Sequence, residues 1–208
     1  MKKLLLALST IAALTATSTQ VSAAPVDLSS WLVLGDGQVN ASTAKVTTAY
    51  TDESLLGSGA LDINTLETQL GTASGTLGVN AYEGSALSQS FSFASSTSLS
   101  FNWTLGTDIF NVGFADLAFV LVDGTLLLPL ANVTAAELSG AFNYTFSAGA
   151  HTFAFGVVDV NDVFGVSTLT VSDVNLAAIT GSVPEPGTLV LMLAGLGLLA
   201  WRARGHNR

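Results

Sequence analysis

Hydrophobic and polar residues alternate strictly in the stretch SLSFNWTL, residues 98–105. Successive side chains of a β-strand point to opposite faces, so the apolar members Leu99, Phe101, Trp103 and Leu105 share one face and the polar members share the other. An antiparallel sheet that is buried on one side only produces this pattern. The stretch therefore predicts a half-buried antiparallel strand.

The same alternation returns in FNYTF and HTFAFGVV. The short β-rich runs SQSFSF, DLAFVLV and STLTVSDVNL complete a series that Gly, Asp and Asn residues separate. Such a series is typical of a β-sandwich or jelly roll. We therefore expect an all-β protein with a single antiparallel sandwich or jelly-roll-like domain. Its predicted core contains Phe101, Trp103, Phe119, Phe142, Phe146, Phe153 and Phe155. In the exceptional segment 52–73, either a short helix around Leu61 to Leu70 or a loop fits the sequence.

The first 23 residues have the layout of a secretory signal peptide. Lys2 and Lys3 precede an apolar stretch from Leu4 to Leu14, and small residues end the segment at Ala23. We expect cleavage after Ala23, with Ala24 as the alternative site. The stretch is far shorter than the ~20 residues of a membrane span. The chain is therefore expected to pass through the Sec export machinery, leaving residues 24–182 as the folded domain.

The domain is strongly acidic. Lys45 is the only Lys or Arg between Ala24 and Val183, where 14 Asp and Glu residues give a formal charge of −13. Binding to nucleic acid or anionic lipid depends on Lys and Arg that neutralise phosphates, so this composition excludes both partners. The chain has no cysteine, so the domain depends on its core, with a metal ion as one further source of stability.

The last segment, residues 183–208, differs from everything before it. Val183-Pro184-Glu185-Pro186 precedes an uncharged run of 15 residues at 187–201, and Arg202, Arg204 and Arg208 follow. A helix over that run spans only about 22 Å, against ~30 Å of hydrocarbon. We expect a marginal transmembrane helix whose arginines keep the domain on the exported side. The two prolines keep the tetrapeptide extended and accessible to a membrane peptidase. A permanent single-span anchor is the alternative.

These three parts, in this order and combined with a signal peptide, resemble the PEP-CTERM sorting signal of Gram-negative bacteria. The resemblance covers the last 25 or so residues and is carried by Val183, Pro184, Glu185, Pro186, Arg202 and Arg204. It implies an inner-membrane precursor that an exosortase processes, so that the domain is released or re-attached at the cell surface. It also implies a setting in cells that produce exopolysaccharide.

The domain is similar to a β-sandwich type common among such proteins, over roughly residues 88–177. The likeness is carried by Phe101-Asn102-Trp103, by the strand from Asp116 to Val120, by Gly156-Val157-Val158-Asp159 and by Asp173-Val174-Asn175. It implies a fold and no particular activity.

Signals for catalysis are weak. His151 is the only histidine of the domain, no Gly-x-Ser-x-Gly motif occurs, and we expect His151 at the edge of a turn. Trp31 and Trp103 are candidates for stacking on a sugar; the alternation places Trp103 in the core, and Trp31 remains open. A carboxylate pair is the remaining catalytic option.

A calcium site is the better chemical candidate. Asp159, Asn161 and Asp162 form the loop DVND after a strand, and Asp173 is expected on a neighbouring strand, with Asp108 or Asp116 as further contributors. Ca²⁺ takes oxygen ligands from carboxylates and carbonyls. The competing interpretation is that these residues are solvated turn residues.

Two functions are consistent with the sequence. The first is an exported cell-surface or matrix protein without catalytic activity, structural or associated with exopolysaccharide. The alternative is an exported glycoside hydrolase that uses carboxylates. The scarcity of His, Lys, Arg and Cys favours the first, because acid–base and oxyanion groups are usually drawn from those residue types.

Overall fold

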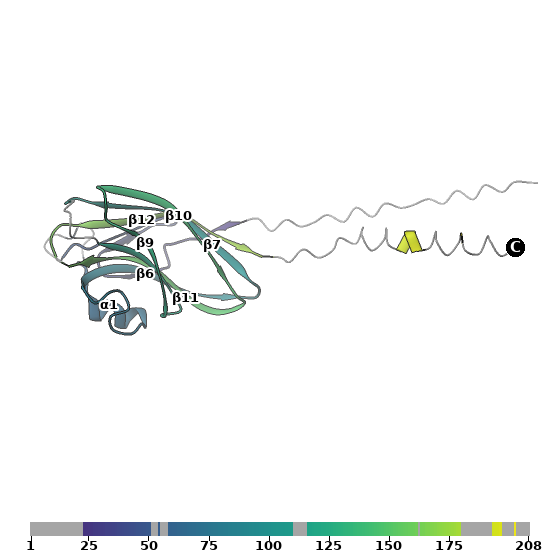
Figure 1. The fold of residues 1–208 in the computed structure, drawn as a ribbon, viewed down its shortest axis with the longest axis horizontal. Helices are drawn as coiled ribbons and strands as arrows, with labels where there is room; N and C mark the ends of the chain where they lie inside the picture. Colours follow the sequence, from purple (N-terminus) through teal and green to yellow (C-terminus); the bar gives the residue numbers. More distant parts are fainter. Residues whose placement is uncertain are drawn as a thin grey trace, which may run out of the picture. The chain divides into compact units, whose positions relative to one another are not determined.

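The computed structural model describes residues 23–50, 54, 58–109, 116–161, 163–179, 193–196 and 202. Residues 1–22 of the predicted signal peptide and the residues Val183 to Pro186, Arg204 and Asp162 lie outside them. Residues 22–179 form one compact unit. It consists of two antiparallel sheets packed face to face, which confirms the predicted all-β sandwich (Figure 1).

Sheet A has the strand order β10-β7-β12-β4-β3, with β1 pairing beside β4 on β12. Its strands are β1 (Ala24–Pro25), β3 (Gly37–Val39), β4 (Thr43–Thr47), β7 (Thr97–Thr107), β10 (Glu137–Phe146) and β12 (Ser167–Ala178). Sheet B has the order β2-β6-β11-β8-β9, with β5 pairing on β6. Its strands are β2 (Leu32–Leu34), β5 (Leu61–Asp62), β6 (Ala81–Phe93), β8 (Leu117–Val122), β9 (Leu126–Asn132) and β11 (Gly149–Val160).

The alternation in β7 works as predicted. Leu99, Phe101 and Leu105 are buried between the sheets, whereas Asn102 is exposed on the outer face of sheet A. Of the other predicted core residues, Phe119, Phe146, Phe153 and Phe155 are buried. Phe142 and Trp103 are half-buried and pack against the core from the side. Trp103 covers Gly140 of β10, where a Cβ atom would lie 2.6 Å from the indole ring.

Trp31 is a core residue. Its exposed fraction is 4%, and its ring centroid lies 5.5 Å from that of Phe155, 5.8 Å from Phe91 and 6.1 Å from Phe153. Edge-to-face and tilted contacts of this kind stabilise a packed aromatic cluster. Trp31 is therefore unavailable as a sugar-stacking platform.

The segment for which a helix or a loop was expected contains the helix α1 (Ile63–Leu70). Asp62 caps its first turn by accepting the Thr65 amide hydrogen, and Gly71 ends it in the left-handed conformation at φ 69°. α1 lies against the outer face of sheet B (Figure 1). Its Leu66 joins a second apolar cluster with Phe119 and Leu121 of β8. This packing explains why β8 is apolar on both of its faces.

Candidate functional site

The outer face of sheet A is polar and carries no covering helix within the described part of the chain. α1 covers the other sheet. On β7 and β12 the residues that point away from the core are hydroxyl and amide side chains, because apolar residues occupy the alternate positions: Ser98, Ser100, Asn102, Thr104, Thr168, Thr170 and Ser172. A sheet face of this kind is open to a ligand that offers hydrogen-bonding groups.

A groove of about 640 Å³ crosses this face. Its floor is formed by Lys45 of β4, Thr170 of β12 and Thr104 of β7, since Thr170 is paired with both of the others in the sheet register. Thr168 stands opposite Gly106, which adds no side chain to the floor. The floor of the groove therefore has small hydroxyl side chains beside one ammonium group, and Ile109 and Val166 add apolar side chains to the lining.

Lys45 is the only cation of the domain, and its side chain is half-buried in the groove. Among the described residues it makes no ion pair with a carboxylate; the one contact at ion-pair distance found there joins the His151 ring to the Asp123 carboxylate. An ammonium group has three hydrogens to donate. Lys45 thus presents hydrogen-bond donors to whatever occupies the groove.

Two carboxylates line the same groove, Asp108 after β7 and Glu137 at the start of β10. Asp108 Oδ1 accepts the Val166 amide hydrogen at 2.6 Å, and the Asp108 amide donates to the Val166 carbonyl at 3.2 Å. These two bonds tie the loops at this end of the groove together. Both carboxylates are exposed, so they add acceptors to the donors of the floor.

A second groove of about 350 Å³ lies on the same face and involves β7, β10 and β12. Its polar side chains form a small network in which Asn102 Nδ2 donates to Asp173 Oδ2 at 3.0 Å. Asn175 Nδ2 donates to the Asp173 backbone carbonyl at 2.6 Å. Asp173 has a φ of 54° and lies where the pairing of β12 with β7 shifts register. Its conformation is therefore that of a bulge residue.

The predicted calcium ligands are distributed over both sheets. Asp159 is fully buried in β11 of sheet B, whereas Asp173 is exposed on β12 of sheet A. Asn161 follows β11 with a φ of 72°, and its amide donates to the Asn80 carbonyl at 2.9 Å. Within the described residues, no three His, Cys, Asp or Glu side chains are grouped to hold a metal ion. Asp162 lies outside those residues, so a calcium site around the DVND loop stays a prediction.

The two further candidates, Asp108 and Asp116, have different roles. Asp108 belongs to the groove described above. Asp116 is buried, accepts the Val160 amide hydrogen at 3.2 Å and accepts the Ser167 hydroxyl hydrogen. These bonds connect the end of β11 with the start of β12, and hence the two sheets.

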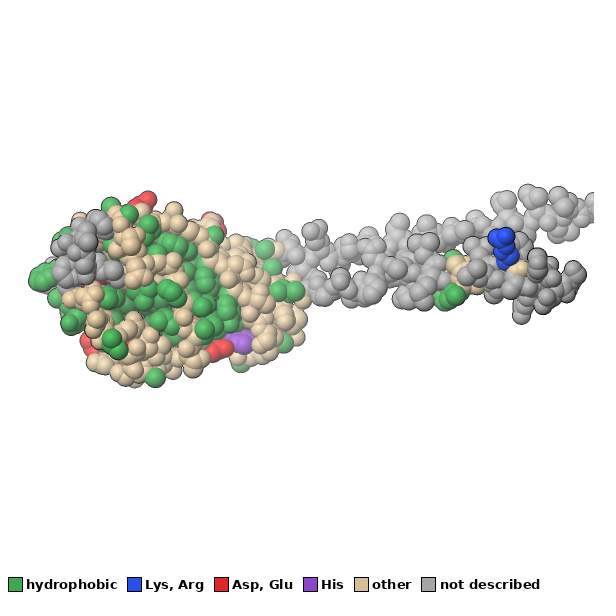
Figure 2. Space-filling model, in the orientation of Figure 1, with side chains coloured by type: hydrophobic (Ala, Val, Ile, Leu, Met, Phe, Trp, Pro, Cys, Tyr) green, Lys and Arg blue, Asp and Glu red, His purple; other side chains and the backbone are tan. Residues whose placement is uncertain are grey.

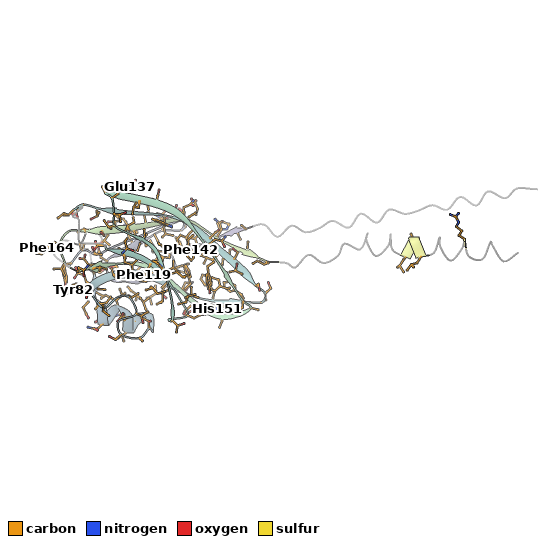
Figure 3. The ribbon with its side chains drawn as sticks, viewed as in Figure 1. Tyr82, Phe119, Glu137, Phe142, His151 and Phe164 are labelled. Carbon is orange, nitrogen blue, oxygen red and sulfur yellow. The ribbon has the colours of Figure 1, made fainter. Side chains whose placement is uncertain are left out.

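His151 lies at the start of β11 beside the turn between β8 and β9, consistent with a position at a turn edge (Figures 2 and 3). Its Nδ1 is 2.9 Å from Asp123 Oδ2, and its Nε2 is 3.1 Å from the Ser147 carbonyl and 3.4 Å from Ser147 Oγ. This order of groups is that of an Asp-His-Ser triad. The two shorter contacts, to the Asp123 carboxylate and to the Ser147 carbonyl, are both to acceptors, and a neutral ring has one N–H to donate. The Ser147 hydroxyl makes the longest of the three contacts, so the ring is not aligned on it as a triad requires, and the contacts serve to hold the turn.

Asp123 contributes to the same turn. Burial opposes ionisation of its carboxyl group, but the hydrogen bonds from His151 and from the Thr152 amide outweigh this effect and lower the pKa of Asp123. The Thr152 amide lies 2.8 Å from Asp123 Oδ1. The charged form of Asp123 is thus favoured by the fold.

Several acids that the sequence analysis did not single out are buried. Glu67 in α1 accepts the amide hydrogens of Gly75 and Leu77, each at 2.8 Å. Tyr50 lies at the end of the domain beside α1, and its pKa is raised to about 12. The largest cause is its hydrogen bond to Glu83, and burial and the charges of Glu83, Asp159 and Asp62 add to it. The phenol therefore stays protonated and is no base. No local sequence signal distinguishes these acids from exposed ones, because the hydrogen-bond partners are backbone groups and side chains at least eight residues away.

The tail adds one structural observation. Of the sorting-signal residues, Arg202 lies within the described part of the chain, and its side chain is exposed. No helix in the described residues is both long and apolar enough to cross a membrane.

Comparison with known proteins identifies the tail. Residues 182–207 match the family described as the PEP-CTERM protein-sorting motif. This match confirms the resemblance noted in the sequence. No curated protein matches the chain.

Among solved structures, the chain is similar to a family 61 carbohydrate-binding module in complex with β-1,4-galactotriose, with 16% identity, a TM-score of 0.35 and coverage of 74% of this chain and 91% of that one. A family 35 carbohydrate-binding module from Clostridium thermocellum gives 12% identity, a TM-score of 0.33 and coverage of 72% and 97%. The N-terminal cellulose-binding domain of Cellulomonas fimi β-1,4-glucanase C gives 12% identity, a TM-score of 0.33 and coverage of 73% and 90%. At these TM-scores the similarities say nothing about what the chain binds.

Proposed function

We propose that this PEP-CTERM domain-containing protein is a non-catalytic, glycan-associated β-sandwich that binds exopolysaccharide at the cell surface or in the extracellular matrix. The sorting motif at residues 182–207 implies an exported protein that an exosortase processes. Passage through the Sec machinery, and anchoring by a helix over residues 187–201 before processing, are parts of the proposal.

The observation that carries the glycan assignment is the groove on the outer face of sheet A. Sugar hydroxyls both donate and accept hydrogen bonds, and so do the hydroxyls of Thr104, Thr168 and Thr170 that line it. Lys45 supplies donors, and Asp108 and Glu137 supply acceptors. A surface at −13 repels polyanions, so a glycan without a high density of negative charge fits best.

The position of the groove would keep it accessible in a protein that is attached by its tail. Ala24 pairs with Leu176, close to the end of β12 at Ala178, so both ends of the domain lie at one end of sheet A. The groove is bounded by Asp108 and Gly165 at the other end of β12. A 12-residue strand spans about 40 Å. A domain held by its tail would thus carry the groove at the end away from the attachment.

The alternative of a glycoside hydrolase rests on Asp108 and Glu137, which line one groove. Hydrolysis needs one carboxyl group in its protonated form as a general acid, and enzymes produce this by burial or by a close like charge. Asp108 and Glu137 are instead exposed, and Asp108 Oδ1 already accepts the Val166 amide hydrogen. Binding without turnover is therefore the better interpretation.

A polysaccharide-retention assay with the purified chain tests both functions. The double variant Thr104→Val and Thr170→Val removes two hydroxyls at nearly constant shape, and we expect about tenfold weaker binding or more, from about 1 kcal/mol per lost hydrogen bond. Thr152→Val, exposed on sheet B, is the matched control and should bind like the parent. Release of sugar products that Asp108→Asn or Glu137→Gln abolishes would establish the hydrolase. Absence of retention on every neutral and amino polysaccharide would refute the glycan proposal.

A further inference from the structure

The four edges of the two sheets differ in how well they are protected. A free edge presents unpaired N–H and C=O groups, which proteins usually protect with short strands, prolines, bulges or charges. β2 and β3 have three residues each. β9 contains Pro129 and a register shift in its pairing with β8. β10 has ten residues, no proline and no shift in its pairing with β7. Within the described chain, no strand pairs with its other side.

The surroundings of β10 are also depleted in charge. The domain has 14 acids, yet Glu137 is the only one in β10 and in β7, the strand that pairs with it. Figure 3 shows Glu137 at one end of β10 and Phe142 further along the strand. A strand edge without charge can approach another strand without desolvating an ionised side chain.

Half-buried apolar side chains accompany this edge. Five of them, from β7, β9 and β10, pack against the core while part of their surface stays exposed: Trp103, Leu128, Leu130, Phe142 and Tyr144. Exposed apolar surface beside an unpaired strand is the combination that strand addition removes from water.

We propose that β10 pairs antiparallel with β10 of a second copy of this chain, so that sheet A continues across a two-fold axis. The partner is a second copy because two antiparallel β10 strands place uncharged residues opposite uncharged residues, so that no charge is buried in the contact. In the register centred on Phe142, Ser139 faces Thr145 of the second copy and Ala141 faces its Asn143. Gly140, which Trp103 already covers, faces Tyr144 of the second copy. Glu137 remains outside the paired residues.

The pairing would join two polar faces. Both grooves of each copy reach β10, through Glu137 in the larger one and through Ala141 and Asn143 in the smaller one. A continuous sheet would place the four grooves on one surface, and two linked sites bind a long polymer more tightly than one. The pairing itself is independent of glycan binding, and its tests need no glycan.

Charge exchange across the proposed register is the first test. Ser139→Glu with Thr145→Glu places like charges opposite each other twice in the dimer, whereas the two positions are six residues apart within one copy. The mass of the purified full-length chain, measured by light scattering in non-ionic detergent, should be that of a dimer for the parent. The glutamate variant and the matching Ser139→Lys, Thr145→Lys variant should each dimerise about tenfold more weakly or worse. Mixing the two variants should restore the dimer. A monomeric parent, or a mixture that does not associate, would overturn the proposal.

Cross-linking tests the register directly, because the chain has no cysteine of its own. Residues opposite each other in antiparallel strands have Cα atoms about 4.5–5.5 Å apart, within reach of a disulfide. Chains with Ser139→Cys mixed with chains carrying Thr145→Cys should form a mixed disulfide under mild oxidation. Ser139→Cys chains mixed with Gln38→Cys chains, altered at the opposite edge, should not. Equal yields from the two mixtures would mean that the copies meet elsewhere, which would also overturn the proposal.

Discussion

Replacing Glu67 by alanine should destabilise the domain, although removing one acid from such an acidic domain also reduces charge repulsion. Its exposed fraction is 1%, and its two carboxylate oxygens accept the Gly75 and Leu77 amide hydrogens that hold the loop after α1. Alanine leaves both amides without this partner. The Leu77 amide is buried and bears the full cost of about 1–3 kcal/mol for an unsatisfied group. The Gly75 amide is partly exposed, so water recovers part of its loss.

The loss of both hydrogen bonds should lower the free energy of unfolding by about 2–4 kcal/mol, which corresponds to a fall of roughly 5–15 °C in Tm for a domain of this size. The Tm of Glu67→Gln should lie between those of Glu67→Ala and the parent, because the glutamine amide oxygen accepts one hydrogen while its NH₂ group faces the second N–H. Glu137→Ala removes an exposed carboxylate and should change stability by less than about 0.5 kcal/mol. Thermal unfolding followed by circular dichroism at one ionic strength measures all three. If Glu67→Ala and Glu137→Ala unfold at the same temperature, the carboxylate does not hold the loop.

Four further outcomes are expected. Trp103→Ala should cost about 3 kcal/mol in denaturant unfolding, the lower end for a tryptophan because the ring is half-buried; parental stability would make it a surface residue. The pKa of Asp123 is below its ordinary value of 3.8, so its contribution is present above about pH 4 and is lost as the pH falls through the folded-state pKa. The Tm difference between parent and Asp123→Asn should therefore shrink at acidic pH, and a constant difference would contradict this. If the DVND loop around Asp162 binds calcium, Tm in millimolar calcium should exceed Tm in EDTA or magnesium; superimposable curves would exclude the site. Mass spectrometry of surface-extracted protein should find a mature chain without Trp201 and Arg208, and their retention would argue for a permanent anchor.

Periodicity in the sequence was sufficient for the fold class. Alternation is a local property of a strand with one buried face, so Phe101, Phe153 and Phe155 could be assigned to the core before any pairing was known. The tail was equally readable, because a sorting motif is recognised as a linear order of residue types. The period-two rule was less informative for β8, where α1 covers the second face and Phe119 and Leu121 are buried on it.

The site depended on the tertiary structure. Lys45, Thr104 and Thr170 are far apart in the sequence and meet because β12 lies between β4 and β7. The burial of Glu67 and Asp116 follows from partners at Leu77 and Ser167, which composition cannot reveal. The free edge of β10 likewise exists only because of the strand order. Which residues face the core follows from local geometry, whereas which groups share a surface is decided by non-local strand pairing. The sequence by itself therefore determined the fold class and the sorting motif, and the strand order determined the groove and the free edge of β10.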